Sequence, residues 1–221
     1  MPSPDDILLG VPSPEPSATS TGEYRHDIQV LVKVLTPGTA ARNARAVVQD
    51  VLQRAGLTPD AVADAEIVVG ELAANAERHG RQPYELRLFR IDGTPAWCEV
   101  VDADPSPEKI RDTFHRLATL PTPDPAPLAE NGRGLLLAHE LTEGHCHAYW
   151  TTTTTTGTLA KAVAFALPTP TGTRLTPDTL PNLRPTLARL RRARLNRPGL
   201  TAAIPVIGST SSPPVQRAES E

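Results

Sequence analysis

Three polar residues recur at intervals of four along one stretch of the chain: Glu71, Asn75 and His79. If this stretch is helical, the spacing places the three side chains on one face, beside a stripe of Ala, Val and Leu. An asparagine amide oxygen is a hard ligand that suits Mg²⁺, and a nearby carboxylate can accept a proton or orient a hydroxyl. The pattern therefore indicates metal and acid–base chemistry, although an exposed helix face with ordinary polar residues has the same spacing.

Three other segments could contact a ligand. Asp102 ends an apolar run at 97–101, where a carboxylate can accept a hydrogen bond from an exocyclic amine such as that of adenine, or can cap a turn. Gly132, Arg133 and Gly134 precede a short apolar run, so backbone N–H groups at a helix start could approach a phosphate, unless the glycines form a simple hinge. Thr158 follows a glycine and could bond a phosphate or Asp102, or belong to a plain turn.

Hydrophobic periodicity and turn residues predict the elements that position these groups. Thr58, Pro59 and Asp60 have the residue types of a helix start, and the helix they open is expected to run to His79. The predicted strands are 28–35, 84–91, 95–101, 147–155 and 158–167, and the predicted helices are 40–55, 58–79, 107–120 and 134–141.

Composition divides the chain of 221 residues into a core and two tails. Its 24 prolines gather near the start, at 121–127 and beyond 168, where they disfavour helix and sheet interiors. We expect a disordered tail at 1–25, one folded domain at 26–168, and a largely disordered Pro- and Arg-rich tail at 169–221. The net charge of −3, the two cysteines without a CxxC pair, and the start without a basic signal region predict a cytoplasmic protein that is not held in a membrane.

The order of these motifs resembles that of the GHKL ATPases. The series is ELAANAERHG, a hairpin that ends in VVDAD, a Pro-rich segment, NGRGLLLAHEL and a Gly-Thr strand. The resemblance covers about 28–167 and is closest to bacterial anti-sigma-factor serine/threonine kinases. It implies an α+β two-layer sandwich, the GHKL or Bergerat fold, in which helices pack on one face of a mixed β-sheet.

The resemblance also implies a role for each candidate residue. Glu71 corresponds to the catalytic glutamate that activates a hydroxyl, and Asn75 to the asparagine that holds Mg²⁺ against the phosphates of ATP. His79 corresponds to a residue near the ribose or the phosphates, and Asp102 to the adenine-binding aspartate.

Two further matches concern backbone and hydroxyl groups. Gly132, Arg133 and Gly134 correspond to the second glycine box, which approaches the phosphates, and Thr158 to a threonine near the adenine aspartate. The chain departs from the family after Asp102, where Ala103, Asp104 and Pro105 replace the first glycine box and make it stiffer and more acidic.

Three functions fit these observations. The first is a protein serine/threonine kinase in partner-switching control of transcription, which binds Mg-ATP, a sigma factor and a small antagonist protein, as a monomer or homodimer. The second is a non-catalytic protein-binding module on the same fold. The third is nucleic-acid binding by the arginines of the 184–197 tail, a cluster that a solvated tail also explains.

Overall fold

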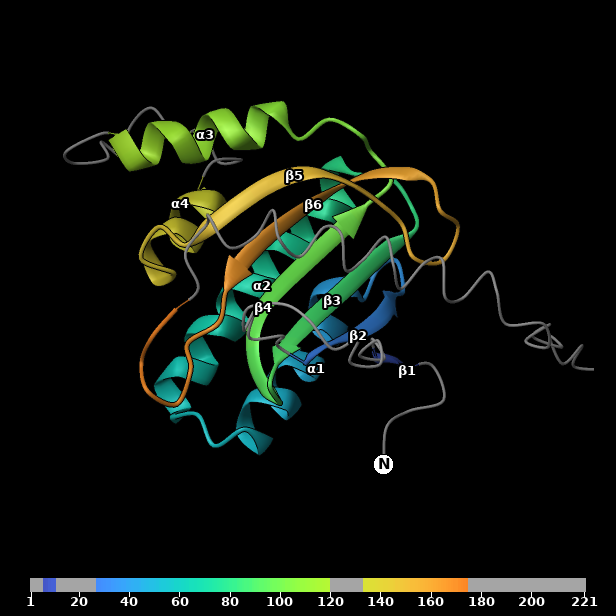
Figure 1. Ribbon diagram of the computed structural model, residues 1–221. Coiled ribbons are helices and arrows are strands. Elements are labelled where there is room, and N and C mark those ends of the chain that lie inside the picture. The colour runs from blue at the N-terminus through green and yellow to red at the C-terminus, as the bar shows by residue number, and fades with distance from the viewer. Residues whose placement is uncertain (1–5, 11–26, 120–132, 175–221) are drawn as a thin grey trace, which may run out of the picture.

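A computed structural model describes residues 6–10, 27–119 and 133–174 of the chain (Figure 1). The elements follow in the order β1 (Asp6–Gly10), β2 (Ile28–Leu35), α1 (Ala40–Arg54), α2 (Pro59–His79), β3 (Tyr84–Ile91), β4 (Thr94–Asp102), α3 (Glu108–Thr119), α4 (Arg133–Leu141), β5 (Cys146–Thr152) and β6 (Leu159–Ala166). The helices and strands predicted within these ranges are confirmed, with ends that differ by a few residues at most.

One sheet with the strand order β1-β2-β3-β4-β6-β5 forms the second layer of an α+β sandwich, so the predicted fold class is confirmed. The pairings differ from the expected mixed sheet, because every pair in the described ranges is antiparallel. A single crossover helix would make β2 and β3 parallel. Here the connection from β2 to β3 consists of two helices, α1 and α2, joined by a short loop, and β3 therefore runs in the direction opposite to β2.

The structure describes a short part of each predicted tail. Within the expected disordered segment 1–25, β1 pairs with β2 in a register that places Asp6 opposite Lys33. This pairing satisfies backbone groups at what would otherwise be an open sheet edge, an effect that local Pro-rich composition cannot reveal. At the other end, Arg174 donates hydrogen bonds to the carbonyl oxygens of Ala166 and Leu141, which ties the chain to β6 and α4 beyond residue 168, the predicted end of the domain.

Helices α1, α2 and α4 cover one face of the sheet (Figure 1). The Thr58 side chain accepts a hydrogen bond from the backbone N–H of Ala61, and Pro59 begins α2 as predicted. The side of α2 that faces the sheet buries Val62, Ala65, Val69, Leu72, Ala73 and Ala76 in the main core. In the part of the chain that the structure describes, no helix combines the length and the apolar character of a membrane span.

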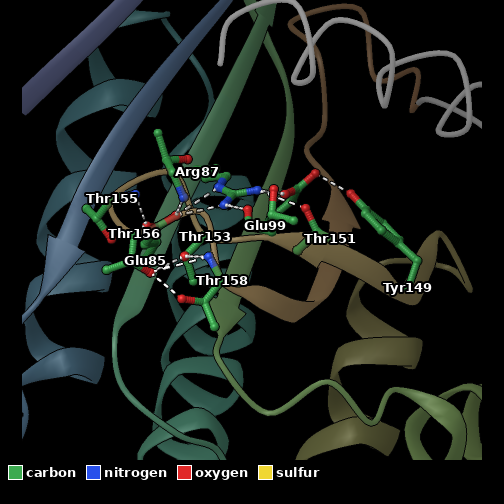
Figure 2. A network of polar contacts seen from close by, with 11 residues as sticks. Glu85, Arg87, Glu99, Tyr149, Thr151, Thr153, Thr155, Thr156 and Thr158 are labelled. Carbon is green, nitrogen blue, oxygen red and sulfur yellow. Dashed lines mark hydrogen bonds and ion pairs between the residues drawn. The ribbon is translucent and has the colours of Figure 1, made fainter. Parts of the chain in front are cut away.

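The other face of the sheet carries an apolar cluster that includes Phe89 and Trp97. At one end of this face, a buried polar network surrounds Arg87 (Figure 2). Its guanidinium lies 2.7 Å from a carboxylate oxygen of Glu85 and 3.6 Å from one of Glu99, whose other oxygen accepts from the Tyr149 hydroxyl.

The threonine run between β5 and β6 closes this network. The Glu85 carboxylate accepts hydrogen bonds from the backbone N–H groups of Thr154 and Thr155 and from the Thr155 hydroxyl, at 2.8–2.9 Å. Burial alone would raise the pKa of Glu85, but Arg87 and these two N–H groups outweigh it and hold the pKa below its ordinary value. The threonine run therefore donates the hydrogen bonds that stabilise the buried Glu85 carboxylate, a role that the sequence alone did not indicate.

Candidate functional site

Asp102 ends β4 and is buried. The described residues donate hydrogen bonds to only one of its two carboxylate oxygens, Oδ1. Its Oδ1 accepts from Lys161 Nζ at 2.8 Å, from the backbone N–H of Asp104 at 3.0 Å and, more weakly, from that of Arg81 at 3.4 Å. No group in the described residues donates a hydrogen bond to Oδ2. The carboxylate is thus fixed in orientation while Oδ2 remains an acceptor for a ligand.

Lys161 is the partner of Asp102 that the sequence analysis missed. The two residues face each other in the β4–β6 register, and Lys161 Nζ also lies 2.8 Å from Asp104 Oδ2. Burial raises the pKa of Asp102 above its ordinary value despite the opposing effect of Lys161. For the more exposed Asp104, burial would likewise raise the pKa, but the bond to Lys161 outweighs it and lowers the value. The acidic residue in place of the first glycine box is therefore compensated by an ammonium group.

Thr158 does not reach Asp102. Its backbone N–H donates to the Thr153 hydroxyl at 3.0 Å, and its hydroxyl lies 2.7 Å from that of Thr156, within the turn between β5 and β6. Because the register aligns Lys161 with Asp102, the residue three positions before Lys161 falls outside this contact. Thr158 belongs to the turn between β5 and β6. Lys161, not Thr158, lies beside Asp102.

The end of α2 packs directly against Asp102. A Cβ atom added to Gly80 would lie 2.4 Å from Cγ of Asp102 and 2.7 Å from the carbonyl oxygen of Ala76. Real Cβ atoms do not approach other atoms so closely, so only glycine permits the helix end to meet this carboxylate. His79 precedes Gly80 in the last turn and is exposed.

Gly80→Ala is expected to destabilise the fold by about 1–3 kcal/mol, the usual cost of overpacking a closely packed position. Thermal unfolding would measure the loss. Gly70→Ala is the matched control, since the nearest atom to its added Cβ is Nη1 at the flexible end of Arg45. The control should unfold at or above the wild-type temperature. Equal behaviour of the two variants would contradict the proposed close packing.

At the other end of the site, the start of α4 packs on α2. A Cβ added to Gly134 would lie 2.6 Å from Oε2 of Glu71 and 3.4 Å from Nδ2 of Asn75. The structure therefore brings Glu71, Asn75 and Gly134 together. Arg133 begins α4 and is exposed, whereas Gly132 lies outside the described residues.

The amide oxygen of Asn75 is held only weakly. Within the described ranges its hydrogen-bond partner is Arg78, whose Nη1 donates to Oδ1 at 3.4 Å, a long and weak hydrogen bond. The first backbone N–H groups of a helix have no acceptor within the helix, and the helix dipole is positive at that end, so the start of α4 favours an anionic group. An asparagine side chain beside such a helix start brings together an amide oxygen, a ligand suited to a cation, and N–H groups suited to the phosphates that the cation neutralises.

Helix α2 joins the two ends of the site. From Glu71 to Gly80 it rises about 14 Å, at 1.5 Å per residue. The carboxylate acceptor at one end and the helix start at the other thus suit the base and the phosphates of an extended nucleoside triphosphate, and the residues present fit such a ligand.

Comparison with known proteins supports this interpretation. The sequence model of the histidine kinase-like ATPase domain matches residues 35–161, more than half of the chain. The match includes the α2 motif, Asp102, the start of α4 and Lys161. A search of curated proteins finds no match. The extent of the family match shows that this chain belongs to the histidine kinase-like ATPase domain family, a class of domain that implies ATP binding.

Proposed function

We propose that this protein binds Mg-ATP and transfers the γ-phosphoryl group to a serine or threonine of a partner protein. The contact that supports this proposal most strongly is the packing of Gly134 on Glu71 and Asn75. In this contact an acid and an amide side chain meet the start of a helix, and Asp102 lies beside the other end of α2. Phosphoryl transfer depends mainly on such positioning and on electrostatic stabilisation.

The base and the phosphates would be held by different residues. Asp102 Oδ2 would accept a hydrogen bond from the adenine amine. Asn75 Oδ1 would be a ligand of Mg²⁺, and the backbone from Gly132 to Gly134 would contact the phosphates, with Arg133 as a charged partner. The bound Mg²⁺ would neutralise charge that develops on the transferred group.

Glu71 would act as the general base. The partner's hydroxyl oxygen attacks the γ-phosphorus, the bond from that phosphorus to the β-bridging oxygen breaks, ADP leaves, and the hydroxyl proton passes to the Glu71 carboxylate. Its position beside Gly134 supports this role, since Oε2 lies against the segment that would hold the phosphates.

The resemblance to anti-sigma-factor kinases suggests the identity of the partners. They would be a sigma factor, a small antagonist protein as phosphate acceptor, or both, in partner-switching control of transcription, with the protein itself acting as a monomer or homodimer. The basic segment 184–197, a candidate for nucleic-acid contact, lies outside the described residues.

Glu71→Gln is expected to bind ATP as the wild type does but to lose at least about 100-fold in transfer rate, the lower end of what a general base supplies. The assay follows label from γ-³²P-ATP with Mg²⁺ into purified antagonist candidates, and calorimetry measures ATP binding. Glu66→Gln, on the same helix, is the control. Transfer at the wild-type rate by the Glu71 variant would exclude the proposed role.

A non-catalytic module is the alternative, and the segment after Asp102 favours it. Asp104 is tied to Lys161, and the carbonyl oxygen of Pro105 accepts from Nε1 of Trp150 at 3.1 Å. These contacts fix a segment that is glycine-rich in the family pattern. ATP binding without transfer to any candidate, together with partner binding that depends on ATP, would favour this function over the kinase.

A further inference from the structure

Lys161 bridges two carboxylates from a buried position. Its Nζ lies 2.8 Å from both Asp102 and Asp104, and its side chain is 6% exposed. A buried ammonium group is costly unless it is paired, and each of these contacts is short enough to be a charge-assisted hydrogen bond. The β4–β6 register, which sets Lys161 opposite Asp102, therefore fixes an ion pair at the end of the proposed nucleotide site that faces the base.

The bridge determines what Asp102 can offer a ligand. The groups that face its carboxylate are Lys161 from β6, Asp104 from the loop after β4, and the backbone of Gly80 and Arg81 after α2. Every hydrogen bond that the described residues donate to this carboxylate reaches Oδ1, so the carboxylate cannot turn without breaking them. Oδ2 is left as the acceptor.

The charge of Lys161 also opposes protonation of Asp102. Burial raises the pKa of Asp102, and the Lys161 ammonium is the first of the groups that oppose this rise. Without the ammonium, the pKa would rise further and the carboxyl group would protonate more readily. A protonated carboxyl group donates as well as accepts, so its preference between ligands would change.

We propose that Lys161 is a positioning residue that makes the base site selective for purines with a 6-amino group. This inference rests on the proposed nucleotide function. An ionised Oδ2 can only accept, so it pairs with the 6-amine of adenine. A 6-oxo purine such as hypoxanthine presents an acceptor at the same position, and two acceptors then face each other without a hydrogen between them.

The test compares ATP with ITP, which differ at position 6 of the base. Calorimetry measures the dissociation constants of both nucleotides with Mg²⁺ at pH 6 and pH 8, for the wild type and Lys161→Met. We use the ratio of the two constants because phosphate ionisation affects both nucleotides alike. The wild type should favour ATP by about 10-fold or more at both pH values, as expected for a hydrogen bond to a charged group.

Lys161→Met should reduce this preference to within about 3-fold at pH 6, and part of the preference should return at pH 8. The sign follows from the raised pKa of Asp102 in the variant, because the ionised form that rejects ITP is restored as pH rises. Asp104→Asn is the matched control. It changes the other carboxylate that contacts Lys161 but leaves the bond between Lys161 and Asp102, so the ATP preference should persist.

Lys161→Gln provides a second variant if Lys161→Met does not fold, since it keeps a polar side chain but removes the charge. An unchanged ATP/ITP ratio and pH profile in a folded Lys161 variant would mean that the lysine is only structural. That result would overturn this inference and leave the proposed function standing. A wild type that binds ATP and ITP equally would do the same. A folded wild type that binds neither nucleotide would overturn both this inference and the proposed function.

Discussion

Arg87→Met is expected to lower the free energy of unfolding by about 3–5 kcal/mol, the usual effect of removing one partner from a buried ion pair. The side chains of Arg87 and Glu85 are almost fully buried, and their charged atoms lie 2.7 Å apart. Methionine fills much of the space but leaves the carboxylates of Glu85 and Glu99 without the cation between them. Urea denaturation measures the change.

Arg54→Met is the control for this prediction. Arg54 also forms an ion pair at 2.8 Å, with Asp50, but both side chains are more than half exposed. Water and salt screen such a pair, so its loss should change stability by less than about 0.5 kcal/mol. Similar effects of the two substitutions would show that the buried network contributes no more than a surface contact.

The effect of Arg87→Met should depend on pH. In the wild type, the folded-state pKa of Glu85 lies below its ordinary value of 4.5. Its contribution to stability is therefore fully present above that value and is lost as pH falls through the folded-state pKa. In the variant, burial acts without Arg87 and favours the protonated form. The difference in stability between the two proteins should therefore be largest near pH 7 and should narrow below about pH 4.5.

Asn75→Ala is expected to weaken ATP binding in the presence of Mg²⁺ by at least about 10-fold, since even residues behind a metal ligand contribute 10- to 100-fold to metal affinity. Without Mg²⁺, the variant and the wild type should bind ATP more nearly alike, because the contact between Asp102 and the base is unchanged. Calorimetric titrations with Mg²⁺ and with EDTA measure both values.

The fold should tolerate this substitution. Asn75 is only partly buried, and the hydrogen bond from Arg78 at 3.4 Å is weak. Arg78→Met, which removes that bond and keeps Asn75, is the matched control and should retain Mg²⁺-dependent binding. If Asn75→Ala weakened ATP binding equally with and without Mg²⁺, Asn75 would not be the metal ligand.

Local sequence signals predicted the part of the site that lies on α2. The four-residue spacing of Glu71 and Asn75 and the start of α2 at Pro59 follow from helix geometry, which neighbouring residues determine. The approach of Gly134 to this face was predicted only through the order of the family motifs. Its cause is the packing of α4 on α2, across more than 50 residues of sequence.

Contacts set by sheet register were not predictable from composition. Lys161 meets Asp102 only because β4 and β6 pair in one particular register, and a shift by one residue would turn Lys161 to the other face. The threonine run had no evident purpose until Glu85, about 70 residues earlier in the chain, was placed against it. In both cases the missing information was which distant strand residue lies opposite.

A calorimetric titration of the wild-type protein with ATP, with Mg²⁺ and then with EDTA, tests the central claim most directly. The site formed by α2, Asp102 and the start of α4 predicts saturable binding of one ATP per chain, with affinity reduced when Mg²⁺ is removed. Circular dichroism of the same sample would establish that it is folded. A folded protein that releases no heat with ATP, and whose melting temperature ATP does not raise, would contradict the account.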